Sequence, residues 1–347
     1  RLAAAGVTGC ILPDLPLEES GDWCEAADTA GVATVMLAAP TAPDDRLPRI
    51  VARSRGFVYS VGLLGVSYLA ISQFQAAASP HTSEGPSALK CIVPWEGMTD
   101  VYRDVACPGG VTGSGFLNFW WHTEVKEALS QSVEEFLRIE EAIPAEMIRV
   151  HPLLDAYWED KAIDLEKIDV PMLVCGSFSD HELHTRGSHR AFERAGSAKK
   201  WLYTHRGGKW SEFYSQEAHA LIKDFMDQFL RGASNQFETA KPVRLEVRSS
   251  RDQVHAVRWE DEWPLARTSY RKLYLGEKGL QAVSLDRESE LTYSGKRGSA
   301  EFDFEFAEDT ELSGFMNLRL WLEARPNDAG GDCPDDMIVC VTVDKID

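Results

Sequence analysis

The sequence predicts an α/β protein with a parallel-sheet core, a helical lid and a C-terminal all-β sandwich. Three observations support this fold class. Short apolar runs alternate with helical patterns over much of the chain before residue 239, which is typical of parallel sheets with helical crossovers. Residues 98–168 carry helical patterns and no clear strand. After about residue 239 the hydrophobic period becomes two, the period of a half-buried strand.

Residues 1–61 are predicted to form a βαβαβ unit. Apolar runs at residues 9–13, 33–39 and 56–61 have the length of strands, and the two intervals between them have helical patterns. Strands and helices that alternate in this order imply parallel pairing with right-handed crossovers.

The stretch from Val61 to Ala70 is the most informative in the chain. An apolar run leads into Gly65, Ser67 follows two residues later, and a helix-prone run begins at Tyr68. This pattern predicts a buried strand that turns sharply into a helix with serine at the corner. Such a corner lifts the hydroxyl clear of the sheet and leaves the Tyr68 N–H at a helix N-terminus, where it can stabilise an oxyanion. A side chain at Gly65 would collide across the turn.

Two later strand-like runs end in residues that could complete a catalytic site. The run that ends at Gly176 is followed by Asp180, and the run that begins at Lys199 ends in His205. Serine needs a base within hydrogen-bond reach, and the base needs a group that fixes its tautomer. We therefore predict a triad of Ser67, Asp180 and His205.

Other assignments of these residues stay open. His181 and His184 are alternative bases, because they follow the same strand as Asp180. Asp180 could instead form an Asx turn, and His205 could be a histidine of a surface loop. The remaining histidines are expected to be ordinary surface or lid residues: His122, His151, His189, His219 and His255.

From Gly62 onward the chain resembles α/β-hydrolases of the cocaine esterase and X-Pro dipeptidyl-peptidase group. Gly62–Ala70 resembles their nucleophile elbow, in which leucine commonly stands two residues after the serine. Ile92-Val93-Pro94-Trp95-Glu96-Gly97 resembles the next strand, and Tyr102-Arg103-Asp104 and Pro108-Gly109-Gly110 follow it as they do in the group. The resemblance runs to Asp347. It implies the order serine, acid, histidine for the triad and a jelly-roll domain at the C-terminal end.

The oxyanion hole is the weak point that this resemblance identifies. In the group, the second donor is usually a tyrosine hydroxyl after an early strand of the sheet. That part of the hydrolase is missing here, and residues 13–16 would take its place with Pro-Asp-Leu-Pro, which contains no tyrosine. Since one lost donor typically costs about 10²–10³ in rate, we expect impaired activity.

Residues 1–61 resemble a different family, the tryptophan synthase alpha chain, of which they match an internal fragment. The matching residues are Ala5–Gly9, Leu12–Ser20, Leu37–Thr41 and Gly56–Tyr59. In that family the catalytic glutamate and aspartate come from strands before this segment, so they are missing here. The chain is therefore predicted to be a composite of two families.

The lid region and the neighbouring strand supply the candidate pocket residues. Phe119, Trp120 and Trp121 form an aromatic patch that could line a substrate pocket or simply pack the lid. Trp95 and Glu96 lie in the strand that is predicted to follow the elbow, Ile92–Gly97. Glu96 could pair with a substrate amine or be a solvated carboxylate at a strand end.

The C-terminal region is predicted to be an antiparallel sandwich. Its expected strands are residues 243–247, 302–306, 316–322 and 337–343. Apolar residues alternate with polar ones in the first two, and no helical pattern intervenes. We expect this domain, a jelly roll by resemblance, to be truncated.

Composition excludes several classes of function. The 347 residues carry a net charge of −19, which repels nucleic acid, and no apolar run approaches the length of a membrane span. The seven cysteines include no C-x-x-C pair, which favours reduced, buried cysteines in a cytoplasmic protein. No metal or organic cofactor is needed for triad chemistry, and a homo-oligomer is possible.

These observations lead to one expected function. Residues 1–61 form the synthase-like segment, residues 62–238 the hydrolase core with its lid at about 98–168, and residues 239–347 the sandwich. The chain is predicted to be a serine hydrolase of a small ester, an amide or a short X-Pro peptide. The alternatives are a synthase-like lyase without its catalytic carboxylates, and a catalytically inactive composite or binding protein.

Overall fold

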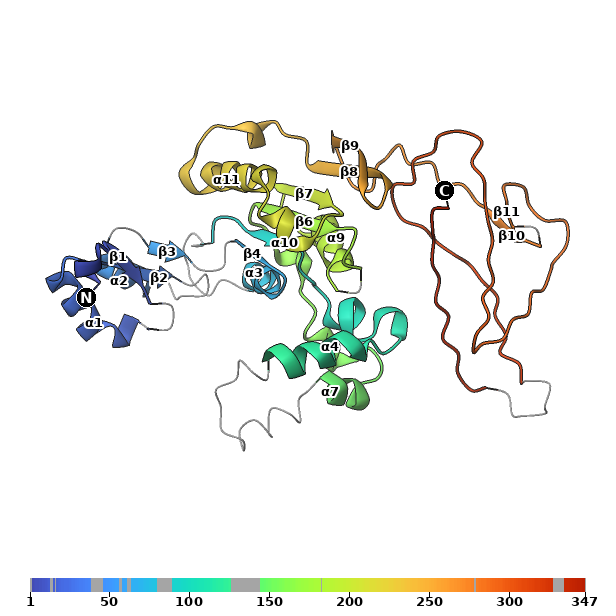
Figure 1. Ribbon diagram of the computed structural model, residues 1–347, viewed down its shortest axis with the longest axis horizontal. Coiled ribbons are helices and arrows are strands. Elements are labelled where there is room, and N and C mark those ends of the chain that lie inside the picture. Colours follow the sequence, from blue (N-terminus) through green and yellow to red (C-terminus); the bar gives the residue numbers. More distant parts are fainter. Residues whose placement is uncertain are drawn as a thin grey trace. The chain divides into compact units, whose positions relative to one another are not determined.

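The computed structural model describes residues 2–12, 15, 17–38, 46–55, 58–60, 64–79, 89–125, 144–181, 183–277, 279–326 and 334–346. These residues form two compact units, Arg1–Glu260 with Cys340–Asp347, and Asp261–Val339. Figure 1 shows the elements of each. No helix within the described ranges is long and apolar enough to cross a membrane.

The N-terminal segment forms a small parallel sheet. Its strands are β1 (Gly9–Ile11), β2 (Ala33–Ala38) and β3 (Val58–Ser60), in that spatial order. The helical elements are η1 (Ala3–Ala5), η2 (Leu17–Glu19), α1 (Gly21–Thr29) and α2 (Arg46–Arg53). Cys24, Met36 and Ile50 form its buried cluster. The order and direction of the strands are those predicted, but the described strands pair only with one another and do not join the second sheet.

A six-stranded sheet forms the centre of the larger unit. Its order is β4 (Leu64–Val66), β5 (Val93–Trp95), β6 (Met172–Ser177), β7 (Lys200–His205), β8 (Val243–Ser250) and β9 (Gln253–Glu260). The first five strands are parallel and β9 is antiparallel to β8. Every residue of β6 is buried, as expected for a parallel strand covered on both faces.

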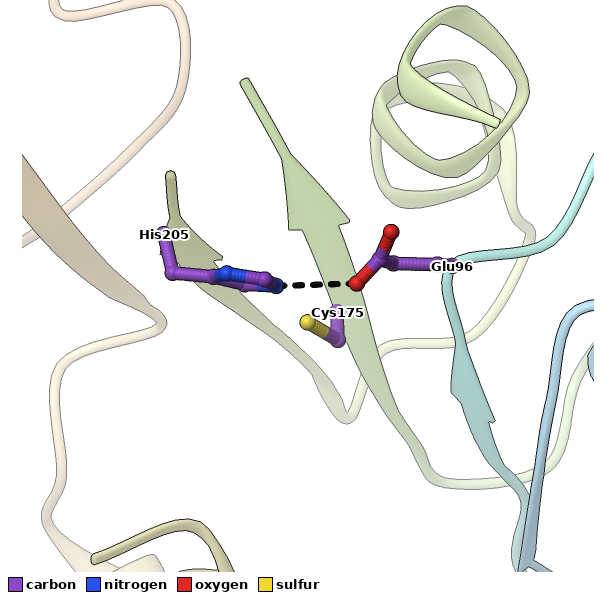
Figure 2. A group of neighbouring side chains, drawn as sticks. All are labelled: Glu96, Cys175 and His205. Carbon is purple, nitrogen blue, oxygen red and sulfur yellow. Dashed lines mark hydrogen bonds and ion pairs between the residues drawn. The ribbon is translucent and has the colours of Figure 1, made fainter. Parts of the chain in front are cut away.

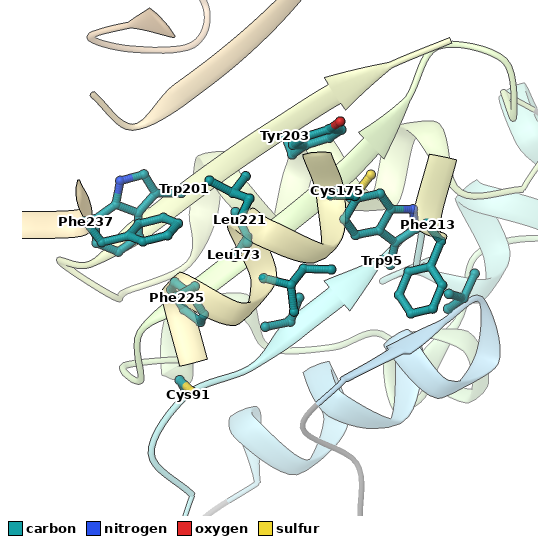
Figure 3. Close-up of a cluster of buried hydrophobic side chains, with 14 residues drawn as sticks. Cys91, Trp95, Leu173, Cys175, Trp201, Tyr203, Phe213, Leu221, Phe225 and Phe237 are labelled. Atoms are coloured by element: carbon teal, nitrogen blue, oxygen red, sulfur yellow. The ribbon is translucent and has the colours of Figure 1, made fainter. Parts of the chain in front are cut away.

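The helices of this sheet are α3 (Tyr68–Ala78), α9 (Thr185–Arg194), α10 (Lys209–Phe213) and α11 (Gln216–Arg231), with η7 (Gln236–Glu238) before β8. The sequence pattern of α11 explains its place, because Ala218, Leu221, Ile222 and Phe225 recur at helical spacing and are all buried. They pack on alternate residues of β5, β6 and β7, whose period is two (Figure 3). This core fixes the strand ends that carry the site.

The region between β5 and β6 is helical where it is described. Its elements are η3 (Tyr102–Ala106), η4 (Pro108–Gly110), α4 (Ser114–Trp120), η5 (Trp121–Val125), α7 (Pro144–Val150), α8 (Ala156–Glu159) and η6 (Leu165–Lys167). Tyr102, Ile148 and Trp158 belong to its own buried cluster. The predicted absence of strands therefore holds for residues 98–125 and 144–168, and the role of the region as a lid stays a prediction.

The C-terminal region differs from the prediction in two ways. The first expected sandwich strand is β8, which pairs with β7 and continues the central sheet, and the first compact unit runs to Glu260. The domain boundary at residue 239 stays a prediction. Beyond Glu260, the described strands are β10 (Tyr274–Gly276) and β11 (Gly279–Gln281), an antiparallel pair. The described residues of 302–306, 316–322 and 337–343 have no strand assigned, so the jelly roll stays a prediction.

Candidate active site

Ser67 stands at the corner between β4 and α3, as predicted. Its backbone has φ 62° and ψ −121°, a conformation that non-glycine residues rarely adopt and that recurs where a structure holds a functional group in place. The Ser67 N–H donates to the carbonyl of Trp95 at 3.0 Å, and the N–H groups of Ala70 and Ile71 donate to the carbonyl of Ser67. The strained corner is therefore hydrogen-bonded to the next strand and to the first turn of α3.

Close packing explains the glycine before the serine. A Cβ at Gly65 would lie 2.4 Å from the Cβ of Leu69, so only glycine lets β4 approach α3 this closely. The N–H of Tyr68, the expected oxyanion donor, belongs to the first residue of α3.

Ser67 is hydrogen-bonded to His184. Its Oγ lies 3.2 Å from His184 Nε2, and His184 Nδ1 lies 2.5 Å from Asp180 Oδ2. Asp180 follows β6, and His184 is the residue just before α9. The imidazole is only 1% exposed. These three side chains, from the ends of two parallel strands, have the connectivity of a nucleophile, a base and an orienting acid.

A backbone turn brings Asp180 and His184 together. The N–H groups of His184 and Thr185 both donate to the carbonyl of Asp180 at 3.0 Å. Residues four positions apart in such a turn lie on the same side of it, which lets the carboxylate reach the imidazole. The sequence signal for this pair is the spacing Asp-x-x-x-His directly after a buried strand.

His205 does not contact Ser67 through any described interaction. It ends β7 and is fully buried, and its Nε2 lies 3.1 Å from Glu96 Oε1 (Figure 2). The partner of Ser67 in the structure is thus one of the two alternative histidines, and not the one expected from the sequence. The physical reason is the direction of the side chain. His205 belongs to β7, and its ring points toward the buried carboxylate of Glu96, which follows β5.

Glu96 is a buried residue, and the expectation of a solvated carboxylate is wrong. It follows β5, has φ 51° and is 1% exposed. Besides His205, the ammonium of Lys209 lies 4.0 Å from its Oε2. A carboxylate can be buried at this depth because both neighbours can carry positive charge.

Lys209 is the residue of the site that the sequence did not reveal. It begins α10, and its Nζ lies 2.7 Å from Asp180 Oδ2 and 3.1 Å from His184 Nδ1. Burial raises the pKa of Asp180, but hydrogen bonds and the charges of His184 and Lys209 outweigh it and hold this pKa well below its ordinary value. Asp180 is therefore an ionised acceptor over the physiological pH range.

No described interaction joins the side chains of the predicted pocket aromatics to the Ser67 hydroxyl. Trp95 is fully buried between Tyr203 and Phe213, so it belongs to the core (Figure 3). Phe119 is 61% exposed, and Trp120 and Trp121 are partly buried beside it.

Two side-chain clusters have a spacing that could suit a metal ion. In one, Glu96, Asp180 and His184 lie within 4.8 Å of each other, but the Lys209 ammonium already contacts this group. In the other, Cys175 joins Glu96 and His205 (Figure 2). Burial raises the pKa of the Cys175 thiol well above its ordinary value, so a metal ion bound here would have to displace the thiol proton.

Comparison with known families divides the chain. Residues 1–79 match the tryptophan synthase alpha chain, residues 51–210 match the X-Pro dipeptidyl-peptidase (S15 family), and residues 235–346 match the X-Pro dipeptidyl-peptidase C-terminal non-catalytic domain. The first two matches overlap at residues 51–79, which include the elbow.

Individual relatives show the same division. The tryptophan synthase alpha chain of Streptomyces coelicolor is 54% identical over 67 residues, covering 19% of this chain and 25% of the relative, and that of Thermobifida fusca is 50% identical over 66 residues. A solved CocE/NonD family hydrolase from Staphylococcus aureus is 28% identical with a TM-score of 0.56, over 81% of this chain and 44% of that one.

The chain spans less than half of that hydrolase and about a quarter of the curated synthase relatives. The predicted composite is nevertheless confirmed, because both resemblances appear in the expected order and the fold is the expected mostly parallel sheet with helices. From about residue 62 onward the chain resembles the α/β-hydrolases of the cocaine esterase and X-Pro dipeptidyl-peptidase group, and residues 1–61 resemble an internal fragment of the tryptophan synthase alpha chain.

Proposed function

We propose that the chain is a serine hydrolase in which Ser67 is the nucleophile, His184 the general base and Asp180 the group that orients it. The observation that carries this proposal is the hydrogen-bond chain from Ser67 Oγ through His184 to Asp180, at 3.2 and 2.5 Å. The resemblance of this region to a hydrolase group supports the reaction class. The contact to Ser67 favours His184 over His205, the base expected from the sequence.

The reaction would proceed in two steps. In the first, Ser67 Oγ forms a bond to the substrate carbonyl carbon while its proton passes to His184 Nε2. His184 then gives this proton to the leaving alcohol or amine as the carbonyl–heteroatom bond breaks. In the second, water attacks the acyl-enzyme, its proton passes to His184, and the released Ser67 oxygen takes that proton back.

The substrate class follows from the family and from the donors at hand. The substrate would be a small ester, an amide or a short peptide with proline as its second residue, by analogy with the X-Pro dipeptidyl-peptidase family. Only the Tyr68 N–H is assigned as an oxyanion donor. Ester hydrolysis tolerates a single oxyanion donor better than amide hydrolysis does, because the alcohol leaving group of an ester departs more readily. We therefore expect ester turnover to exceed amide turnover.

Labelling with a fluorophosphonate probe tests the nucleophile and the base separately. We expect the purified full chain to be labelled, Ser67→Ala to lose labelling, and His184→Gln to lose most of it. His205→Gln, checked for folding by circular dichroism, should retain more labelling than His184→Gln. Wild-type protein that is folded and unlabelled would overturn the proposed function, and labelling lost only in His205→Gln would return the base role to His205.

Two chromogenic substrates then separate the substrate classes. Hydrolysis of p-nitrophenyl acetate reports esterase activity, and hydrolysis of an alanyl-prolyl p-nitroanilide reports dipeptidyl-peptidase activity. We expect the first to be the faster, with both lost in Ser67→Ala. Faster release from the anilide would contradict the expected preference for esters.

A further inference from the structure

The ammonium group of Lys209 lies among the charged groups of the candidate site. It is 2.7 Å from Asp180 Oδ2, 3.1 Å from His184 Nδ1 and 4.0 Å from Glu96 Oε2. The Lys209 side chain is 21% exposed, so its charge is largely withdrawn from water. Lys209 reaches the site from α10, an element that carries neither the nucleophile nor the acid.

Two carboxylates surround this ammonium group. Oxygen atoms of Glu96 and Asp180 and a ring nitrogen of His184 all lie within 4.8 Å of one another. Carboxylates this close disfavour each other's ionisation, and a cation beside both relieves the repulsion. The low pKa of Asp180 is consistent with this, because the charge and hydrogen bond of Lys209 are among its causes.

The same ammonium contacts the imidazole of His184. Lys209 Nζ and His184 Nδ1 both lie against Asp180 Oδ2, so the carboxylate is held between the ring and the ammonium. The groups that face His184 come from four elements: Ser67 from the β4–α3 corner, Glu96 from the end of β5, Asp180 from the loop after β6, and Lys209 from α10.

Other charges near α9 are engaged elsewhere. Arg186, two residues after His184, donates to Asp104 in the helical region. The positive charge in contact with the His184 ring is thus that of Lys209.

We propose that Lys209 is a positioning residue of this site: its ammonium, which contacts Asp180 and His184 and lies near Glu96, holds the Asp180 carboxylate against His184 Nδ1. This inference rests on the proposed function, because it assigns Lys209 a role toward the same base. Without the ammonium, the repulsion between the two carboxylates is no longer relieved, and the Asp180 carboxylate turns away from the imidazole that it orients.

The test compares Lys209→Met with Lys209→Arg, which keeps the charge. The control is Lys223→Met, which removes a lysine paired with Asp227 on the surface of α11. The rate of fluorophosphonate labelling is measured for each variant. In Lys209→Met this rate should fall about 10- to 100-fold, because the base is no longer held in place. Lys209→Arg should restore most of the rate, and Lys223→Met should match wild type.

A second readout does not depend on catalysis. The proton shared by His184 Nδ1 and Asp180 gives a low-field signal in the proton NMR spectrum, assigned by its absence in His184→Gln. This signal should be present in wild type, lost in Lys209→Met and restored in Lys209→Arg. If Lys209→Met is unfolded by circular dichroism, Lys209→Gln replaces it in both measurements.

The outcomes separate the two proposals. Equal labelling rates and equal low-field signals in wild type and Lys209→Met overturn the role of Lys209 and leave the proposed function standing. Absence of labelling in wild type overturns the proposed function, and the low-field signal then decides whether Lys209 holds Asp180 against His184. A stronger signal in Lys209→Met also overturns the inference, because it reverses the predicted effect.

Discussion

Replacing Gly65 with alanine should disrupt the nucleophile corner. The new Cβ would lie 2.4 Å from Leu69 Cβ and 3.3 Å from the Leu69 carbonyl carbon, where ordinary contacts begin at 3.4 Å. The distance between β4 and α3 must therefore increase by about 1 Å, the difference between 3.4 and 2.4 Å. The Leu69 Cβ is fixed by the α3 backbone, so no side-chain rotation relieves the clash. Overpacking of this kind costs about 1–3 kcal/mol.

The same movement carries an activity cost. Ser67 lies between Gly65 and Leu69, so separating β4 from α3 displaces the hydroxyl from His184. A misplacement of about 1 Å can reduce the rate about 10²-fold. We expect Gly65→Ala to label with fluorophosphonate about a hundred times more slowly than wild type, and to melt at least about 2 °C lower.

Gly21→Ala is the matched control for this experiment. Gly21 begins α1, and a Cβ there meets no atom within 4 Å. Its melting midpoint and labelling rate should equal those of wild type. Midpoints are compared, and not free energies, because a chain with two compact units need not unfold in two states. Gly65→Ala with a wild-type midpoint and wild-type labelling would refute the packing argument.

Three further predictions concern the core and the thiols. Phe225 is fully buried, with Phe229 4.8 Å away between ring centroids, so Phe225→Ala should destabilise the larger unit by about 3–5 kcal/mol and Phe225→Leu by less; an unchanged urea midpoint would contradict this. Burial raises the pKa of the Cys91 thiol to about 12, so at pH 8 iodoacetamide should modify exposed Cys340 long before Cys91, as read by mass spectrometry. Unfolded Cys91 releases its proton near its ordinary pKa, whereas the folded thiol keeps it. The contribution of Cys91 to the free energy of unfolding should therefore fall above about pH 8.5, by at most about 1.4 kcal/mol per pH unit. Cys91→Ala should flatten this dependence of stability on pH. Native Cys91 reacting as fast as Cys340 would show that the thiol is not sequestered.

The sequence predicted the corner at Ser67 because its signal is local. A strand, a close-packed glycine, a serine and a helix follow one another within ten residues, and each has a short-range physical cause. The βαβαβ order of the first segment and the helical region before β6 could be predicted for the same reason, since both depend on hydrophobic period. Asp180 could be identified because it directly follows a buried strand.

The partner of Ser67 could not be predicted in this way. His184 and His205 both follow strand-like runs, and the choice depends on where a pleat and a turn direct each ring. His205 lies within the regular part of β7 and meets Glu96, whereas His184 lies in a turn closed by the Asp180 carbonyl. Lys209 was missed for a similar reason. Its contacts are with residues from two other parts of the chain, and no local pattern marks a lysine that bridges them.

Hydrophobic period alone does not identify the sheet that a strand joins. The alternation in residues 243–250 correctly predicts a strand, but a strand with that pattern can extend an existing sheet or begin a new one. Here it pairs with β7, and Thr204 Oγ1 donates to the carbonyl of Arg244 across the pair. The pairing with β7, which is distant in sequence, therefore determines which sheet this strand joins.

The order of the central sheet has a consequence for the strand that precedes the nucleophile. Among the described strands, β4 pairs on one side with β5 and lies at the edge of the sheet, with Leu64 38% exposed. An unpaired edge offers backbone donors and acceptors that invite another strand. The strand that leads into Ser67 is thus also an open edge of the sheet. A separately supplied peptide that paired with β4 as an added strand would lie directly beside the element that positions the Ser67 hydroxyl.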